Sequence, residues 1–287
     1  MLGLIDLILN LAGVLLWLNW RAVRFDPLVK TTPATLVGTL RRAEPRQLKR
    51  WHFLAALAGM LLLRAVIYWQ IGSEVNWTPN LHLGGVDVAV PFRSDRDRHW
   101  PGFMLLYSVL SFGVTLGVFY LSLLLLSLVN GRSGEDDPLQ RLVRLHLGRI
   151  DRWPWPIKAV LPFLVAFAAW FLASLLFARY QIIPPPVSNH HRLEQAVIVG
   201  LGWYLIWKYL IGVLLAVHLV SSYVYFGNQP IWNFVALTGR NLLSPLRRLP
   251  LHFGKIDFAP LVGVVLVFLA AYGAERGLTS LFRRLPL

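Results

Sequence analysis

Six long apolar segments run through this chain of 287 residues, and they are the feature that most restricts its fold. They cover residues 2–19, 53–71, 103–129, 159–178, 196–226 and 259–274. The hydrocarbon core of a bilayer is about 30 Å thick, and a helix of roughly 20 residues crosses it. Hydrophobic residues make up 56% of the chain and charged residues 15%, whereas about a quarter of a soluble domain is charged. We therefore predict an all-α, polytopic helical membrane protein with six transmembrane helices.

The first and last of these segments need separate comment. Asp6 lies inside the first segment, and no basic region precedes it, so this segment is interpreted as a retained span rather than a signal peptide. The sixth segment is short, and we expect it to begin in the interface or to thin the bilayer locally.

The positive charge of the chain predicts its topology. There are 28 Lys and Arg residues against 14 Asp and Glu residues, a net charge of +14. Most of the basic residues lie in the loops that follow segments one, three and five. The positive-inside rule then places these loops in the cytoplasm and both termini on the non-cytoplasmic side, in a bacterial inner membrane. Contact with anionic lipid headgroups explains the charge better than nucleic acid does.

The most specific feature is an internal repeat. Residues 138–151 read PLQRLVRLHLGRID, and residues 245–257 read PLRRLPLHFGKID. One inserted residue aligns the two, and a proline and an apolar segment follow each copy. The aligned pairs that we single out are Pro138 with Pro245, Arg141 with Arg248, Gly148 with Gly254, and Asp151 with Asp257. Such repeats commonly mark a duplicated bundle in membrane proteins.

Each copy predicts a short amphipathic helix in the membrane interface. In the first copy we expect Leu139, Leu142 and Val143 on the apolar face, opposite Gln140, Arg141 and Arg144. In the second copy the expected apolar face is Val235, Leu242, Leu246 and Leu249. The glycine then allows a tight turn, the aspartate can cap the next helix, and the proline suits its first turn.

The second copy resembles the YggT family of small bacterial and plastid membrane proteins. The resemblance rests on PLRRLPLHFGKIDFAP between two apolar segments, with Pro245, Arg247, Arg248, Gly254, Asp257 and Pro260 as the motif residues. Residues 103–194 resemble a degenerate first unit, in which Gln140 replaces the first arginine, and residues 195–287 resemble a second unit. Residues 1–102 are interpreted as a two-span extension with an outer loop. Within that loop, residues 81–91 echo the same turn, either by coincidence or as the relic of an inverted unit.

Three of the polar residues inside apolar segments are singled out here, because a charge in a span is costly and is by default a functional hypothesis. Arg64 and Lys208 are expected to snorkel towards the outer surface, or else to pair with Glu74, Asp87 or Glu194. His218 either hydrogen-bonds between helices or ligates haem or chlorophyll. His190 and His191 are interpreted as a polar loop end. The chain has no cysteine, so thiol catalysis and disulfides are excluded.

These features favour a non-enzymatic role. The resemblance implies a scaffold or accessory subunit that assembles or organises a membrane complex, with other membrane proteins as partners and no resident metal or cofactor. It also implies envelope, division and osmotic-stress functions and, in plastid relatives, cytochrome haem maturation. Two alternatives stay open: a transporter or channel for a small solute or ion, and a haem- or pigment-binding subunit that uses His218.

Overall fold

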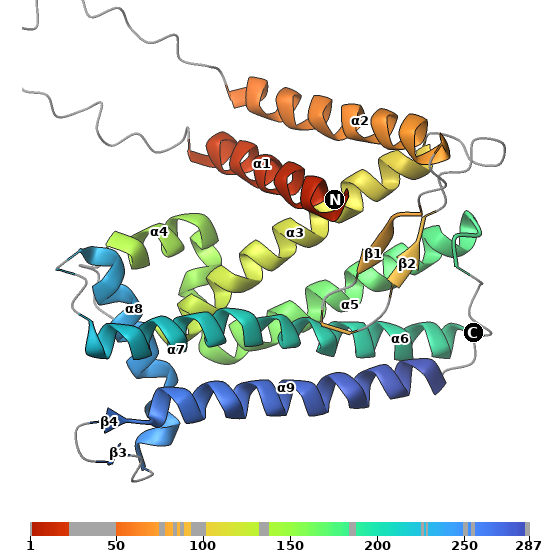
Figure 1. Ribbon diagram of the computed structural model, residues 1–287. Helices are drawn as coiled ribbons and strands as arrows, with labels where there is room; N and C mark the ends of the chain where they lie inside the picture. The colour runs from red at the N-terminus through yellow and green to blue at the C-terminus, as the bar shows by residue number, and fades with distance from the viewer. Residues whose placement is uncertain are drawn as a thin grey trace, which may run out of the picture. The chain divides into compact units, whose positions relative to one another are not determined.

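Within the described residues, six helical segments are long and apolar enough to span a membrane, as the sequence predicts. Figure 1 shows the helices along the chain. The computed structural model describes residues 2–22, 50–74, 78–82, 85–86, 89–92, 102–131, 138–183, 188–224, 227, 229–248, 252–253 and 256–284. The spans are α1 (Leu2–Ala22), α2 (Arg50–Glu74), α3 (Gly102–Val129), α5 (Trp155–Arg179), the continuous α6–η4–α7 segment (Asn189–Tyr223) and α9 (Ala259–Arg284). The chain is thus an all-α polytopic membrane protein.

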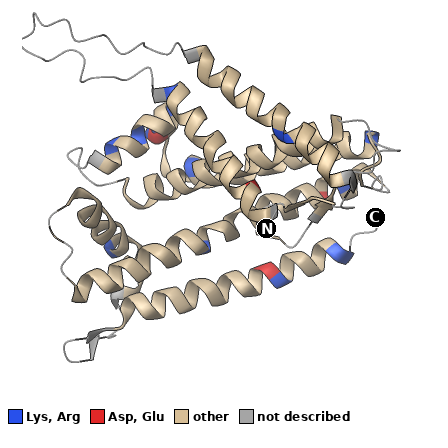
Figure 2. Cartoon of the chain, turned by 45° about the horizontal axis from the view of Figure 1, so that its top comes forward, with Lys and Arg blue, Asp and Glu red and all other residues tan. Residues whose placement is uncertain are grey.

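The surface of these helices is apolar. Leu172 on α5 and Leu269 on α9 are 61% and 62% exposed, which water would penalise and lipid does not. A helix satisfies its own backbone hydrogen bonds, which is what lipid demands of a spanning segment. Figure 2 shows that charged residues are sparse along the helices and that most of the ribbon is uncharged.

The chain forms two compact units. The first consists of residues 1–81 and 91–116, and the second of residues 82–90 and 117–287. In the first unit α1 packs against α2. In the second unit α5 packs against α6, and α7 packs against both α8 (Pro230–Leu242) and α9. The three-part division expected at residues 102 and 194 stays a prediction.

Glycines allow close helix contacts in the second unit, as small residues commonly do in membranes. A Cβ atom at Gly212 of α7 would lie 2.7 Å from the Phe268 ring of α9. A Cβ atom at Gly239 of α8 would lie 2.5 Å from Cγ of His218 on α7. Any larger residue at these positions would push the helices apart.

The amphipathic helix α4 (Pro138–Leu147) packs on the C-terminal half of α3. Val143 and Leu147 form a core there with Leu123 and Leu124, and Gln140 is also buried. The expected faces are therefore wrong for Gln140, which shares the buried face with Val143 instead of lying opposite it. Positions 140, 143 and 147 repeat with the period of a helix, so one polar residue shares the buried face.

The second copy of the repeat adopts a different local structure. Its helix, α8, precedes the aligned residues, and η5 (Ser244–Arg248) is a short 3₁₀ segment. The strands β3 (His252–Phe253) and β4 (Ile256–Asp257) then pair antiparallel. The aligned residues His146 and His252 thus lie in a helix and in a strand respectively. The echo at residues 81–91 contains β1 (Asn80–His82) and β2 (Ala89–Pro91), which form a two-stranded sheet.

Two expected span boundaries and one expected loop position are wrong. The sixth span is not short, since α9 continues for 26 residues to Arg284. The fifth begins at Asn189, seven residues before the apolar run. His190 and His191 therefore lie in the first turn of α6 rather than at a loop end, and Ser188 caps that turn by accepting a hydrogen bond from the His191 N–H.

Candidate functional site

The first copy of the motif brings Asp151 against two spans. Gly148 has a φ of +60°, the left-handed region that glycine tolerates, and it turns the chain from α4 into η3 (Gly148–Arg152). Asp151 Oδ1 accepts a hydrogen bond from Ser127 Oγ of α3 at 2.5 Å. Lys158 Nζ of α5 donates to the same hydroxyl at 3.0 Å and lies 3.8 Å from Asp151 Oδ1. Arg144 Nε lies 3.4 Å from Asp151 Oδ2.

This cluster corrects the expected role of the aspartate. The N-cap of α5 is Pro154, and no side chain caps that helix. Asp151 instead links α3, α4 and α5, since Ser127 and Lys158 are both buried. A carboxylate that compensates two cations makes the burial of Lys158 tolerable. The arrangement therefore stabilises the turn between two spans.

Basic side chains surround this cluster on the outside. Arg141, Arg149 and Arg152 are exposed, and Arg144 is 30% exposed. The guanidinium group is suited to bidentate hydrogen bonding with phosphate. Pro138 begins α4, where its missing N–H costs nothing.

A second polar link, which we did not predict from the sequence, joins α3 and α8. Buried Asn130, just after α3, donates from Nδ2 to Thr238 Oγ1 at 2.7 Å. Asn241 Nδ2 donates to Asn130 Oδ1 at 3.0 Å. Thr238 and Asn241 lie three residues apart on one face of α8, which is the only trace of this link in the sequence. The contact attaches α8 to the end of α3.

Only part of the second copy can be compared. Pro245 lies in η5, and buried Pro260 is the second residue of α9, as expected of a first-turn proline. Gly254 and the side chains of Arg247, Arg248 and Asp257 lie outside the described residues.

Arg64 is at the centre of a buried network in the first unit. Its side chain is 0% exposed, so it does not snorkel, and it pairs with Asp6 at 2.7 Å, a partner that we did not expect. Of the expected partners, Asp87 and the side chain of Glu74 lie outside the described residues. Arg64 also donates to Asn10 Oδ1 at 2.7 Å and to Ser111 Oγ at 3.0 Å. The network therefore joins α1, α2 and α3.

Asp6 is fully engaged by donors. Besides Arg64, it accepts hydrogen bonds from the Tyr68 hydroxyl and, at 2.7 Å, from the Tyr107 hydroxyl. The Arg64 guanidinium also lies 5.4 Å and 5.5 Å from the centres of these two rings, within cation–π range. A charge inside a span is tolerated here because opposite charge and polar groups surround it.

Lys208 of α7 likewise has a partner that the sequence interpretation missed. Its Nζ donates to Glu275 Oε2 of α9 at 2.6 Å, and the Lys208 side chain is only 11% exposed. Glu194, one of the expected partners, contacts His190 and His191 instead, whereas Asp87 and the side chain of Glu74 lie outside the described residues. The ion pair neutralises Glu275, the first charged residue of α9 after the apolar run.

His218 packs against Gly239 where α7 meets α8. Within the part of the chain that the structure describes, the metal-ligating side chains that converge in a group of three are His190, His191 and Glu194. His218 is outside that group, and its role as a haem or pigment ligand stays a prediction.

Together these observations define the class: a polytopic helical membrane protein whose polar residues link its spans and whose short amphipathic helices flank them. The model of the CCB3/YggT family matches residues 196–276, which comprise the second half of α6, then η4, α7 and α8, and most of α9. Over this segment the chain is similar to the CCB3/YggT family, in agreement with the resemblance that the motif carries. No curated protein and no solved structure matches the chain.

Proposed function

We propose that this protein is a non-enzymatic membrane scaffold or accessory subunit that helps to assemble or organise a membrane protein complex. The observation that supports it best is the Asp151 cluster. The conspicuous polar residue of the motif is engaged in holding α3, α4 and α5 together through Ser127, Arg144 and Lys158. A motif that holds a surface helix in place between spans suits a protein that works by presenting a fixed binding surface to its partners.

The proposed contacts are anionic lipid headgroups and other membrane proteins. The exposed arginines around α4 suit phosphate groups, and the exposed Leu142 and Leu145 provide an apolar strip between them. With the positive-inside topology, this surface would face the cytoplasm of a bacterial inner membrane. No nucleic acid is required to explain the charge.

The polar residues of the spans give less support to transport. Arg64 and Lys208 are the charged residues that a pathway would use, and each has a close carboxylate partner on another helix. Ion flux in liposomes that disappears in Arg64→Ala and Lys208→Ala would favour the transporter and contradict the scaffold.

Site-specific photocrosslinking in cells tests the proposal. A photoreactive residue at Leu142, on the exposed side of α4, is expected to give a discrete crosslinked protein that mass spectrometry identifies. The matched control is Leu172, which is 61% exposed on the lipid-facing side of α5 against 49% for Leu142, and only lipid adducts are expected there. Lipid adducts alone at both positions would contradict a role in complex assembly.

A further inference from the structure

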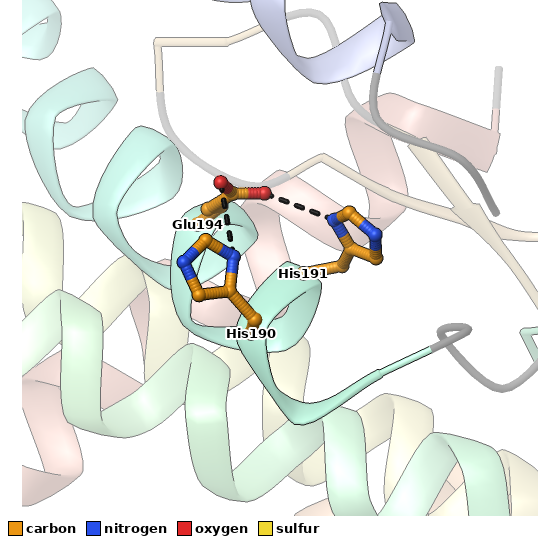
Figure 3. Close-up of side chains that lie close together, drawn as sticks. All are labelled: His190, His191 and Glu194. Atoms are coloured by element: carbon orange, nitrogen blue, oxygen red, sulfur yellow. Dashed lines mark hydrogen bonds and ion pairs between the residues drawn. The ribbon is translucent and has the colours of Figure 1, made fainter.

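Three metal-ligating side chains converge at the start of α6, apart from every cluster described above (Figure 3). His190 Nδ1 lies 3.1 Å from Glu194 Oε1, and His191 Nδ1 lies 3.0 Å from Glu194 Oε2. One ligand atom from each residue lies within 4.8 Å of the other two. We propose that His190, His191 and Glu194 form a surface site for a divalent transition-metal ion of the zinc class.

The donor set matches this class of ion. Two imidazole nitrogens and one carboxylate oxygen are ligands that Zn²⁺ accepts, at about 2.0–2.2 Å. Hard ions such as Ca²⁺ and Mg²⁺ prefer oxygen ligands throughout. Each imidazole would bind through Nδ1 in the tautomer that carries its proton on Nε2, and Glu194 through one carboxylate oxygen. Three protein ligands leave a fourth position open to water, the arrangement of an exchangeable site.

The local structure holds the ligands together without burying them. Glu194 lies four residues after His190 and three after His191, spacings that place side chains on one side of a helix. The N-cap bond from the His191 N–H to Ser188 Oγ fixes the first turn. His190 is 77% exposed, so its ring can rotate to shorten the ligand distances, whereas His191 is 27% exposed and already partly fixed.

The surrounding charge limits the affinity without abolishing it. The N-terminus of a helix carries partial positive charge, which disfavours a cation. Arg192 lies within the same turn, but its Nη1 donates to Asn189 Oδ1 at 3.3 Å. The carboxylate of Glu194 is therefore the group that makes the site competent, and its neutral isostere is the sharpest test.

The same geometry would arise if the two histidines merely hydrogen-bonded to Glu194 and stabilised the helix. These two roles differ in their response to metal. A structural network changes the stability of the metal-free protein, whereas a metal site adds stability only when the ion is present, by linkage. The inference does not depend on the scaffold function proposed above.

The experiment uses the full chain in a neutral detergent, purified through a tag without histidine and stripped with a chelator. Co²⁺ serves as the spectroscopic probe and Zn²⁺ as its competitor. We expect one equivalent of Co²⁺ to give the visible bands of a low-coordinate site, and Zn²⁺ to displace it. Each of His190→Ala, His191→Ala and Glu194→Gln should weaken binding by at least about tenfold.

The control variant is His52→Ala, which removes an imidazole from α2. It should bind as the native chain does, and Zn²⁺ should raise the melting temperature of both but not of Glu194→Gln. Three results would overturn the proposal: no saturable binding, unchanged binding in Glu194→Gln, or an equal loss in His52→Ala.

Discussion

Removing Asp6 should destabilise the first unit more than removing its partner Arg64. In Asp6→Ala the Arg64 guanidinium stays in place, fully buried, and loses its counter-ion. Breaking a buried ion pair in this way costs about 3–5 kcal/mol. We expect Asp6→Ala to fall in that range, with Asn10 and Ser111 as the remaining oxygen acceptors.

The reverse variant leaves a milder problem. In Arg64→Leu the carboxylate keeps the hydroxyl donors of Tyr68 and Tyr107, and its side chain is 16% exposed. The leucine meanwhile adds apolar contacts in the same space. We therefore expect a loss of about 1–3 kcal/mol, the usual penalty of an imperfectly satisfied buried polar group.

The double variant completes the cycle. Replacing both members of a buried pair by apolar residues is often close to neutral. The variant with Asp6→Ala and Arg64→Leu should therefore be more stable than Asp6→Ala alone, although it removes one more native side chain. The measurement is the free energy of unfolding in mixed micelles, from titration with a denaturing detergent. Equal losses in the two single variants, or a double variant no more stable than Asp6→Ala, would refute the reasoning.

Two further predictions concern the contacts of α8. Gly239→Ala should destabilise the second unit by about 1–3 kcal/mol, because its new methyl group clashes with His218. The control is Gly273→Ala on α9, whose methyl group meets nothing within 4 Å and should be neutral or stabilising. Thermal unfolding in detergent compares the two variants. Thr238→Val should lower the free energy of unfolding by about 1–3 kcal/mol, because it leaves the buried Asn130 amide without its acceptor. A melting temperature equal to that of the native chain in the same experiment would contradict this.

Hydropathy predicts the number of spans because lipid imposes one rule on every residue of a span. It does not predict where a helix ends when its last turns are polar. The fifth apolar segment begins only at residue 196, although α6 begins at Asn189. The reason is that the first turns of this helix contain the polar residues His190, Arg192 and Glu194. The sixth apolar segment likewise ends at residue 274, although α9 continues through Glu275, which pairs with Lys208, to Arg284.

The partners of buried charges depend on tertiary contacts that a single sequence does not contain. Asp6 and Arg64 lie 58 residues apart. One signal was present: each is the charge that interrupts an otherwise apolar segment, and the two are of opposite sign. Because an unpaired charge in lipid is costly, pairing such interruptions with each other is a better first hypothesis than snorkelling. The same reasoning would not find Glu275, which lies just outside the apolar run that we assigned.

The position of Gln140 in the first copy, which aligns with an arginine in the second, lies on a buried face. Gln140 occupies the position of Arg247, and it is 1% exposed on the face of α4 that packs on α3. Its Oε1 has no hydrogen-bond partner within the described residues, so the site already tolerates a neutral polar group at some cost. Gln140→Arg would add an uncompensated charge there and should cost several kcal/mol more, about the penalty of an unpaired buried charge.

Gln140→Leu gives the opposite expectation. It removes the unsatisfied oxygen, keeps a similar volume beside Val143 and Leu147, and should be neutral or stabilising. Unfolding of both variants in detergent separates burial from an inherited signature. If the restored arginine were tolerated as well as leucine, the buried face assigned to α4 would be wrong. If only Gln140→Arg unfolds the unit, burial of this face of α4 explains why a neutral residue occupies position 140.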